Sequence, residues 1–326
     1  MNLKKTPWLD FEKPIVELEE RIRTLEDSAS LRGLDVSDEV DRLRQRVESL
    51  GRDIFEKLDP WQRVQRARHP RRPTTNHYID HIFDEFIELH GDRNLRDDPS
   101  LVCGMAWLGD RAVTVIGHQK GRDTKSNIHR NFGMAHPEGY RKALRIMEQS
   151  ARFDRPIITF IDTPGAYPGI GAEERGQGEA IARNLREMAR LHVPIIVIVT
   201  GEGGSGGALA IGVGDRVYML ENAIYSVISP EGCAAILWRD RAKGPDAASA
   251  MKITAKDALK LGAIDAILPE PIGGAHRDYA AVSETIKERI IADLDALAAN
   301  SGKELVDGRL AKFLAMGIFN EKKQDD

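Results

Sequence analysis

The sequence has only two cysteines and no long apolar run. Cys103 and Cys233 lie far apart and form no CxxC pair, so this chain alone can build neither a disulfide framework nor a four-thiolate zinc site. We expect both thiols to be buried in a reducing compartment. The longest purely apolar runs, such as 195–199, are much shorter than the roughly 20 residues that a membrane-spanning helix needs.

A basic excess is also lacking. The 47 Lys and Arg residues stand against 51 Asp and Glu residues, a net charge of -4, so no global attraction to nucleic acid is expected. With 41% hydrophobic residues the chain matches an ordinary globular protein and excludes wholesale disorder. Charged residues occupy the N-terminal positions where a signal peptide would be apolar. We therefore expect a soluble, cytoplasmic protein.

The first sixty residues have helical periodicity. Apolar residues recur at steps of three and four between 14 and 58 and are interrupted near Gly33, which predicts a helical hairpin. Its narrow apolar seam needs a partner surface, on the same domain or on another subunit. Residues 61–73 follow with five arginines and two prolines. They indicate a solvent-exposed basic connector, or alternatively a docking site for an acidic partner or for phosphates.

The main body alternates apolar strands with helices. Residues 101–107 and 111–118 predict a β-hairpin, and 156–162 and 193–200 are apolar runs typical of buried parallel strands. These features predict an α/β sheet with helices on both faces. Shorter expected elements are helices at 137–153, 173–191, 230–238 and 254–261, strands at 216–220, 224–228 and 263–268, a helix through 282–297, and a turn or helix at 310–318.

Two glycine-rich segments each follow an apolar strand. GEGGSGG at 201–207 lies between a strand and a helix, so its backbone N–H groups would point at a ligand above the turn. DTPGAYPGIG at 162–171 has the same context. Because parallel strands end at one edge of a sheet, we expect the two turns to form one oxyanion or phosphate site.

Other interpretations of the first turn remain open. Gly201, Gly203 and Gly206 fit GxGxxG, but no acidic residue is clearly placed to bind a ribose. Gly203, Ser205 and Gly207 fit GxSxG, with Asp265 and His276 in the order of a hydrolase triad. A tight turn without a ligand is a third possibility. A GTPase is improbable, because DTPG has no accompanying phosphate loop.

Longer segments resemble a known family. IDTPGAYPGIGAEERGQGEAIARNL (161–185), GEGGSGGALAIGVGD (201–215) and YSVISPEGCAAILW (225–238) are similar to the α subunits of bacterial acetyl-CoA carboxylase carboxyltransferase, and the similarity covers nearly the whole chain. It implies a crotonase-like α/β fold, a repeated ββα spiral with outer helices. We expect a helical hairpin (1–60), a basic connector (61–76), a carboxyltransferase core (77–278) and C-terminal helices (279–326).

The resemblance also implies an activity. Such subunits transfer a carboxyl group from carboxybiotin, held on a biotin carboxyl carrier protein, to acetyl-CoA, and so form malonyl-CoA in the first committed step of fatty acid biosynthesis. An α₂β₂ assembly with the active site at the β interface is implied. Zinc would lie on the β subunit only, and ATP would be used by the biotin carboxylase component. The chain itself would bind no cofactor covalently and no nucleic acid.

We hypothesise that N–H groups of both turns form the oxyanion hole for the biotin ureido oxygen. Those donors are Gly206 and Gly207 with Gly165 and Ala166, and the candidate substrate-binding residues are Gly203, Gly204, Ser205, Tyr167, Lys120 and Arg122. Solvated surface or structural ion pairs would explain Lys120 and Arg122 equally well. We expect no metal ligands, because His118, His192 and His276 lack metal spacing. Structural roles are expected for the trio 173–175, and a core position for Cys233.

Three rival functions remain. The first is a serine hydrolase that uses Ser205. The second is a scaffold that only docks the biotin carrier. The third is a CoA hydratase or isomerase on the same fold, which would need an acidic catalytic pair that the sequence does not reveal.

Overall fold

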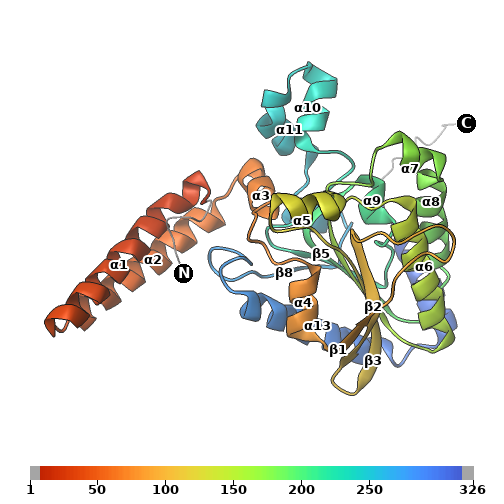
Figure 1. Cartoon of the computed structure of the whole chain (residues 1–326), viewed down its shortest axis with the longest axis horizontal. Coiled ribbons are helices and arrows are strands. Elements are labelled where there is room, and N and C mark those ends of the chain that lie inside the picture. The colour runs from red at the N-terminus through yellow and green to blue at the C-terminus, as the bar shows by residue number, and fades with distance from the viewer. Residues whose placement is uncertain (1–7, 318–326) are drawn as a thin grey trace, which may run out of the picture.

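The computed structural model describes residues 8–317 (Figure 1). No helix in this range is long and apolar enough to cross a bilayer. The expectations for the N-terminal tip and for Ile318 fall outside the described residues. The proposed four-part division of the chain stays a prediction.

One mixed sheet organises the described residues, in the order β1-β2-β3-β4-β5-β6-β8, with β7 paired to β5. Pairing is antiparallel from β1 to β3 and parallel from β3 onward. The expected β-hairpin and parallel strands are confirmed. The strands are β1 (Asp84–Glu88), β2 (Leu101–Leu108), β3 (Arg111–His118), β4 (Ile157–Thr163), β5 (Ile195–Gly204), β6 (Arg216–Leu220), β7 (Ile224–Ser226) and β8 (Ala266–Leu268).

Helices cover the sheet. Every residue of β4 is buried, as expected for a strand with helices over both faces. Helices α6 (Pro137–Arg152) and α8 (Gln177–Met188) pack together, and α6 packs on β2 and β3. On the other side of these strands, α4 (Thr75–Ile82) packs against α13 (Tyr279–Leu297) (Figure 1). The C-terminal helix α14 spans Gly302–Leu314.

Two expectations about element bounds are wrong. The helix expected at 173–191 is divided into α7 (Ile170–Glu174) and α8, because Gly176 between them has φ +83°, a left-handed conformation that interrupts a helix. Strand β5 does not end before the glycine segment but runs through Gly204. It continues because β7 pairs with it from Glu202 onward.

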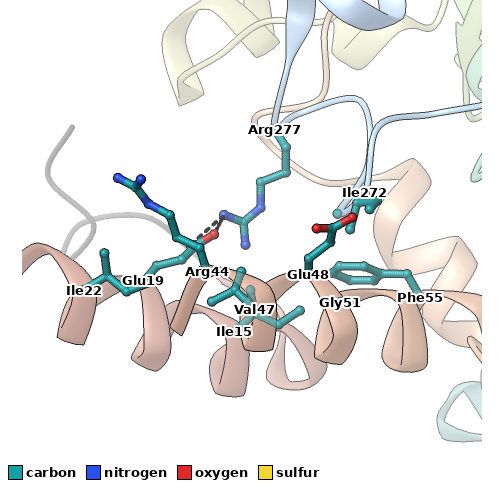
Figure 2. A pocket seen from close by; sticks show the side chains of 11 residues that line it. Ile15, Glu19, Ile22, Arg44, Val47, Glu48, Gly51, Phe55, Ile272 and Arg277 are labelled. Atoms are coloured by element: carbon teal, nitrogen blue, oxygen red, sulfur yellow. Dashed lines mark hydrogen bonds and ion pairs between the residues drawn. The ribbon is translucent and has the colours of Figure 1, made fainter. Parts of the chain in front are cut away.

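The N-terminal hairpin is present and projects from the core (Figure 1). After the short helix η2 (Asp10–Glu12), α1 (Lys13–Arg32) and α2 (Ser37–Glu56) pack on each other, and Gly33 with φ +65° ends α1. At its base the hairpin meets the loop 271–277 across a cleft of about 500 Å³ (Figure 2). Arg277 Nη1 donates to Glu19 Oε2 there at 2.8 Å. A Cβ on Gly51 would lie 3.0 Å from Ile272.

A second projection carries an exposed apolar helix. Helix α10 (Pro230–Trp238) packs mainly on α11 (Gly244–Met251) and leaves Ile236 71% exposed. Cys233 is only partly buried, so its expected core position is wrong. The remaining short helices are α3 (Pro60–Ala67), α5 (Thr124–His129), η3 (Asn131–Gly133), α9 (Ser205–Leu209), η4 (Arg241–Lys243) and α12 (Ala255–Lys260).

The expectation of a solvated basic connector is wrong. Residues 60–67 form α3, which opens with Asp59 capping Gln62 N, and Arg63, Arg66 and Arg72 are buried. Arg63 Nη1 donates to Asn222 Oδ1 at 3.0 Å. Arg63 and Arg72 have acceptors in distant segments of the core. Arg66 instead places its guanidinium over the Phe55 ring, 4.4 Å from the centroid.

Candidate active site

The two glycine turns meet at one edge of the sheet. A Cβ on Gly204 would collide with the Pro164 carbonyl oxygen, and a Cβ on Gly207 would lie 2.5 Å from the Gly165 carbonyl carbon. Only glycine allows this approach of one backbone to the other. Ser205 adopts φ +51°, an uncommon conformation for a residue with a side chain. The expected convergence of the turns is therefore observed.

The beginning of α9 supplies backbone donors. Ser205, Gly206 and Gly207 are its first residues, so their N–H groups have no acceptor within the helix. In the other turn, Gly165 N donates to Thr163 Oγ1 at 3.1 Å. The Gly165 N–H is thus engaged inside its own turn, which opposes the expectation that it binds a ligand. Ala166 follows it in the chain.

A bulge in the sheet lies directly before the turns. Along the β4–β5 ladder, Ile161 pairs with Val199 but Thr163 pairs with Gly203, so two extra residues of β5 are accommodated. The Asp162 carboxylate accepts a hydrogen bond from Glu202 N at 2.9 Å. The Asp162 side chain thus accepts the hydrogen bond that a β4 carbonyl would accept in a regular ladder.

Charged side chains pack under the bulge. Lys120 Nζ donates to Asp162 Oδ1 at 2.7 Å and to Glu202 Oε2 at 2.8 Å. Arg68 Nε donates to Glu202 Oε1 at 2.6 Å, and Arg68 Nη1 donates to Glu231 Oε1 at 2.5 Å. Burial alone would raise the pKa of Glu202, but the Lys120 and Arg68 cations lower it to about 2. Glu202 is therefore a carboxylate at neutral pH.

Arg72 fixes the bulge from the other side. Its Nε donates to Thr200 O at 2.5 Å, and its Nη2 donates to Glu270 Oε1 at 2.6 Å. Sequence reasoning missed the acidic partners Asp162, Glu202, Glu231 and Glu270. A signal existed for two of them, because Asp162 and Glu202 lie inside the two glycine-rich segments.

Two clefts border the first turn. One, of about 650 Å³, is charged and is lined by Arg68, Lys120, Asn127, Phe132, Pro164, Glu202, Ser229, Glu231 and Arg241. The other, of about 480 Å³, is mainly apolar and is lined by Ser205, Gly206, Leu209, Gly212, Val217, Tyr225, Ser226, Val227, Ala263, Phe313 and Met316. An apolar cleft beside directed N–H donors suits a ring system with one polar oxygen.

The other expected substrate-binding residues lie at different distances from the turns. Gly203 and Gly204 end β5, and the half-buried Tyr167 packs against His136 with ring centroids 4.1 Å apart. Lys120 lines the charged cleft. Arg122 is exposed, and its guanidinium lies over the Tyr279 ring and contacts His77. The structure therefore brings Lys120, but not the Arg122 side chain, into contact with a residue that adjoins a turn.

The hydrolase triad is excluded by geometry. His276 is buried, its Nε2 lies 3.3 Å from Glu12 Oε1, and its ring stacks on His69 at 3.9 Å. Asp265 accepts from Val217 N at 2.6 Å and pairs with Lys312. Both candidate partners of Ser205 are thus committed elsewhere.

One group of three potential metal ligands occurs within residues 8–317, namely Glu12, His69 and His276. Arg71 N donates to His69 Nδ1 at 3.2 Å, which in a neutral ring assigns the proton to Nε2, the nitrogen that faces Glu12. The rings are stacked only 21° from parallel, whereas lone pairs on one ion must converge. The cluster fits a polar contact between the hairpin base and the core better than a metal site.

Known proteins match nearly the whole of this chain. The family described as "Acetyl co-enzyme A carboxylase carboxyltransferase-like" matches residues 8–317. The acetyl-coenzyme A carboxylase carboxyl transferase subunit alpha of Syntrophotalea carbinolica is 58% identical over 315 residues, 96% of this chain and 99% of that protein. The subunit of the same name from Geobacter metallireducens is 59% identical over 313 residues, 96% and 98% of the two chains.

Solved structures show the fold. Transcarboxylase 12S aligns with a TM-score of 0.55 at 20% identity, over 78% of this chain and 44% of that one. A Pseudomonas malonate decarboxylase hetero-tetramer in complex with coenzyme A aligns with a TM-score of 0.55 at 20% identity, over 65% and 85%. The crotonase-like α/β fold expected from the resemblance is confirmed.

Proposed function

Because the chain belongs to the acetyl-coenzyme A carboxylase carboxyltransferase family, as an α subunit, we propose that its glycine turns bind the biotin side of the reaction. The family activity is carboxyl transfer to acetyl-CoA, which forms malonyl-CoA for fatty acid synthesis. The α subunit works in a complex with a β subunit. The open question is which groups of this chain take part.

The chemistry requires donors rather than a side-chain base. The bond between N1′ of carboxybiotin and the carboxyl carbon breaks, which releases CO₂ and leaves negative charge on the ureido oxygen. N1′ then takes a proton from the methyl group of acetyl-CoA, and the resulting enolate carbon bonds to CO₂. A preorganised N–H donor at such an oxyanion is typically worth about 3 to 4 kcal/mol.

The observation that supports this assignment is the pair of touching turns. Gly206 N and Gly207 N lie at the start of α9, and Ala166 is carried by the turn that packs on Gly207. We assign the ureido oxygen to these three N–H groups. Gly165 N would join them only if it broke its bond to Thr163.

The clefts support a division of the substrates. The apolar cleft that Ser205 and Gly206 line would hold the biotin rings. Gly203 and Gly204 would allow the turn to pack closely against its neighbours. Tyr167 would border the second turn. Arg122 and the charged cleft remain candidates for phosphates or a carboxylate.

The partners follow from the same proposal. A biotin carboxyl carrier protein would deliver carboxybiotin, a biotin carboxylase would use ATP to make it, and the assembly with β would be α₂β₂. Zinc would be held by β, as the family resemblance implies. The cytoplasmic location stays a prediction.

Gly206→Val tests the assignment. A Cβ at Gly206 would lie 3.4 Å from Ile181, an ordinary contact distance, and the branched valine side chain would add bulk beside the proposed donor. The assay is malonyl-CoA-dependent carboxylation of biocytin by the chain alone, by β alone and by the mixture. We expect activity only in the mixture, and at least a 100-fold lower kcat with the variant, about the loss of one oxyanion donor.

Two results would count against this proposal, one against the donors and one against the function. Normal turnover by the variant complex would remove the donor assignment. No activity in the wild-type mixture, with β shown to be competent alongside another α subunit, would remove the catalytic interpretation. An altered KM for biocytin at unchanged kcat would favour the scaffold alternative.

A further inference from the structure

The stretch of β5 before the donor turn lacks regular pairing to β4. The ladder partner on β5 shifts from Val199 to Gly203 while β4 advances only from Ile161 to Thr163. Each side of this irregularity leads directly into one of the two turns. The relative position of the turns therefore depends on what holds the bulge.

We infer that Lys120 is a positioning residue for carboxyl transfer, and that its ammonium group sets the spacing of the two donor turns by bridging Asp162 and Glu202. This inference rests on the proposed biotin-side function. The bridge is short on both sides, 2.7 Å to Asp162 Oδ1 and 2.8 Å to Glu202 Oε2. Both carboxylates are buried, with 6% and 8% of their side chains exposed.

The lysine is itself held in place. Gln119 N donates to Ser100 O at 2.9 Å, and Gln119 Nε2 donates to Lys120 O at 2.7 Å, which fixes the backbone at this position. A Cβ on Gly133 would lie 3.0 Å from Lys120 Cγ, and one on Gly201 would collide with the Asp162 carboxylate. Two glycines thus make room for the bridge, as expected of a closely packed support.

Lys120 is the cation that both turns share. Arg68 also neutralises Glu202 but donates its other nitrogens to Glu231. The carboxylates raise the pKa of Lys120 against the effect of burial, which lowers it, and the lysine is therefore charged. The charged or titratable groups that share a cleft or a direct interaction with Lys120 are Asp162, Glu202, Arg68, Glu231, Arg241, Arg72, Arg122, His69 and His118. Burial lowers the pKa of His118 to about 3, so this histidine is neutral.

Lys120→Met removes the charge and keeps most of the apolar chain. Glu202 then keeps Arg68 as its counter-charge but loses the cation that it shares with Asp162, and a neighbouring buried carboxylate favours uptake of a proton by Glu202. At high pH repulsion between the two side chains separates the turns. At lower pH a proton on Glu202 restores part of the contact, so activity relative to wild type should rise as the pH falls.

The test uses the complex with β in the biocytin assay, at pH 6 to 8.5. We expect Lys120→Met to lower kcat roughly 100-fold at pH 8, the loss typical of a misplaced reacting group, with little change in KM for malonyl-CoA. The ratio to wild-type kcat should recover at least tenfold at pH 6. The double variant Lys120→Met/Glu202→Gln should exceed the single variant at pH 8, because it removes one of the two charges.

Lys142→Met is the matched control. Lys142 is also buried and pairs with Asp97 at 2.6 Å, but it contacts neither turn. The Lys142→Met variant should be less stable than wild type, and its kcat should show no pH-dependent recovery. Lys120→Arg, which keeps the charge, should be more active than Lys120→Met.

Defined outcomes overturn the inference. With an active wild-type complex, a kcat for Lys120→Met within threefold of normal would reject it. The inference would also be rejected if Lys120→Met lowered kcat equally at all pH values and the double variant did not restore it. If Lys120→Met does not fold, the double variant decides, and wild-type kcat there would reject the role. An inactive wild-type complex would instead count against the proposed function.

Discussion

Glu270 is the buried carboxylate that joins the segment after α3 to the loop after β8. Its side chain is fully buried and accepts hydrogen bonds from Arg72 Nη2 at 2.6 Å, Asn222 N at 2.9 Å and Ala275 N at 2.8 Å. Arg72 in turn donates to Thr200 O in the bulge. We predict that Glu270→Gln, which keeps the shape and removes the charge, is strongly destabilising.

The magnitude follows from the pKa. Burial raises the pKa of Glu270, but Arg72 lowers it by a larger amount. The pKa is therefore about 2, compared with an ordinary value of 4.5. At 1.36 kcal/mol per pKa unit this corresponds to about 3 kcal/mol of folding stability, which matches the 3 to 5 kcal/mol typical of breaking a buried ion pair. Because the folded pKa is the lower one, this stability is fully present above about pH 4.5 and is lost as the pH falls toward 2.

Urea unfolding followed by circular dichroism provides the assay. At pH 7 the variant should lose about 3 kcal/mol, whereas between pH 4.5 and 2 the difference from wild type should shrink. Asp295→Asn, which breaks a solvent-exposed pair with Arg111, should leave the midpoint nearly unchanged. A loss below 1 kcal/mol for Glu270→Gln, or a difference that does not depend on pH, would refute the reasoning.

Two further predictions concern thiols and a second buried cation. Burial raises the pKa of Cys103 to about 12, so Ellman's reagent should react with the partly buried Cys233 in the folded chain and with Cys103 only after unfolding; two fast thiols in the native protein would contradict this. Arg309 is buried and binds Asp215 together with three backbone carbonyls, those of Met188, Leu191 and Val193. Arg309→Met should therefore cost about 3 to 5 kcal/mol, seen in calorimetry as a clearly lower Tm, and an unchanged Tm would show that water replaces these contacts.

Local patterns predicted strands β2 to β8 of the central sheet but not β1. The apolar runs that became β4 and β5 are buried on both faces, and a strand of that kind is recognisable from its own residues. The hairpin α1–α2 was equally clear, because its period repeats over many residues. The break between α7 and α8 depended on the left-handed conformation of one glycine, Gly176, which sequence periodicity does not report.

The basic run at 61–73 shows why other parts could not be predicted. Arg68 binds Glu202 and Glu231, which are 134 and 163 positions away, and Arg72 binds Glu270 198 positions away. A cluster of arginines without nearby acids resembles a solvated linker when only neighbouring residues are considered. Its burial is decided by acidic residues that are distant in the sequence and adjacent only in the folded structure.

The same distinction separates the proposed donors from the residues that we propose support them. Glycines between a strand and a helix predict a donor turn from a few consecutive residues, so Gly206 and Gly207 could be proposed as donors from the sequence. Lys120 could be named only as one candidate among several, because its role depends on Asp162 and Glu202, 42 and 82 positions away. The backbone N–H groups do not titrate, whereas the bridge that Lys120 makes to Asp162 and Glu202 consists of charged groups. A pH-dependent defect is therefore expected from substitution of Lys120 and not from substitution of Gly206.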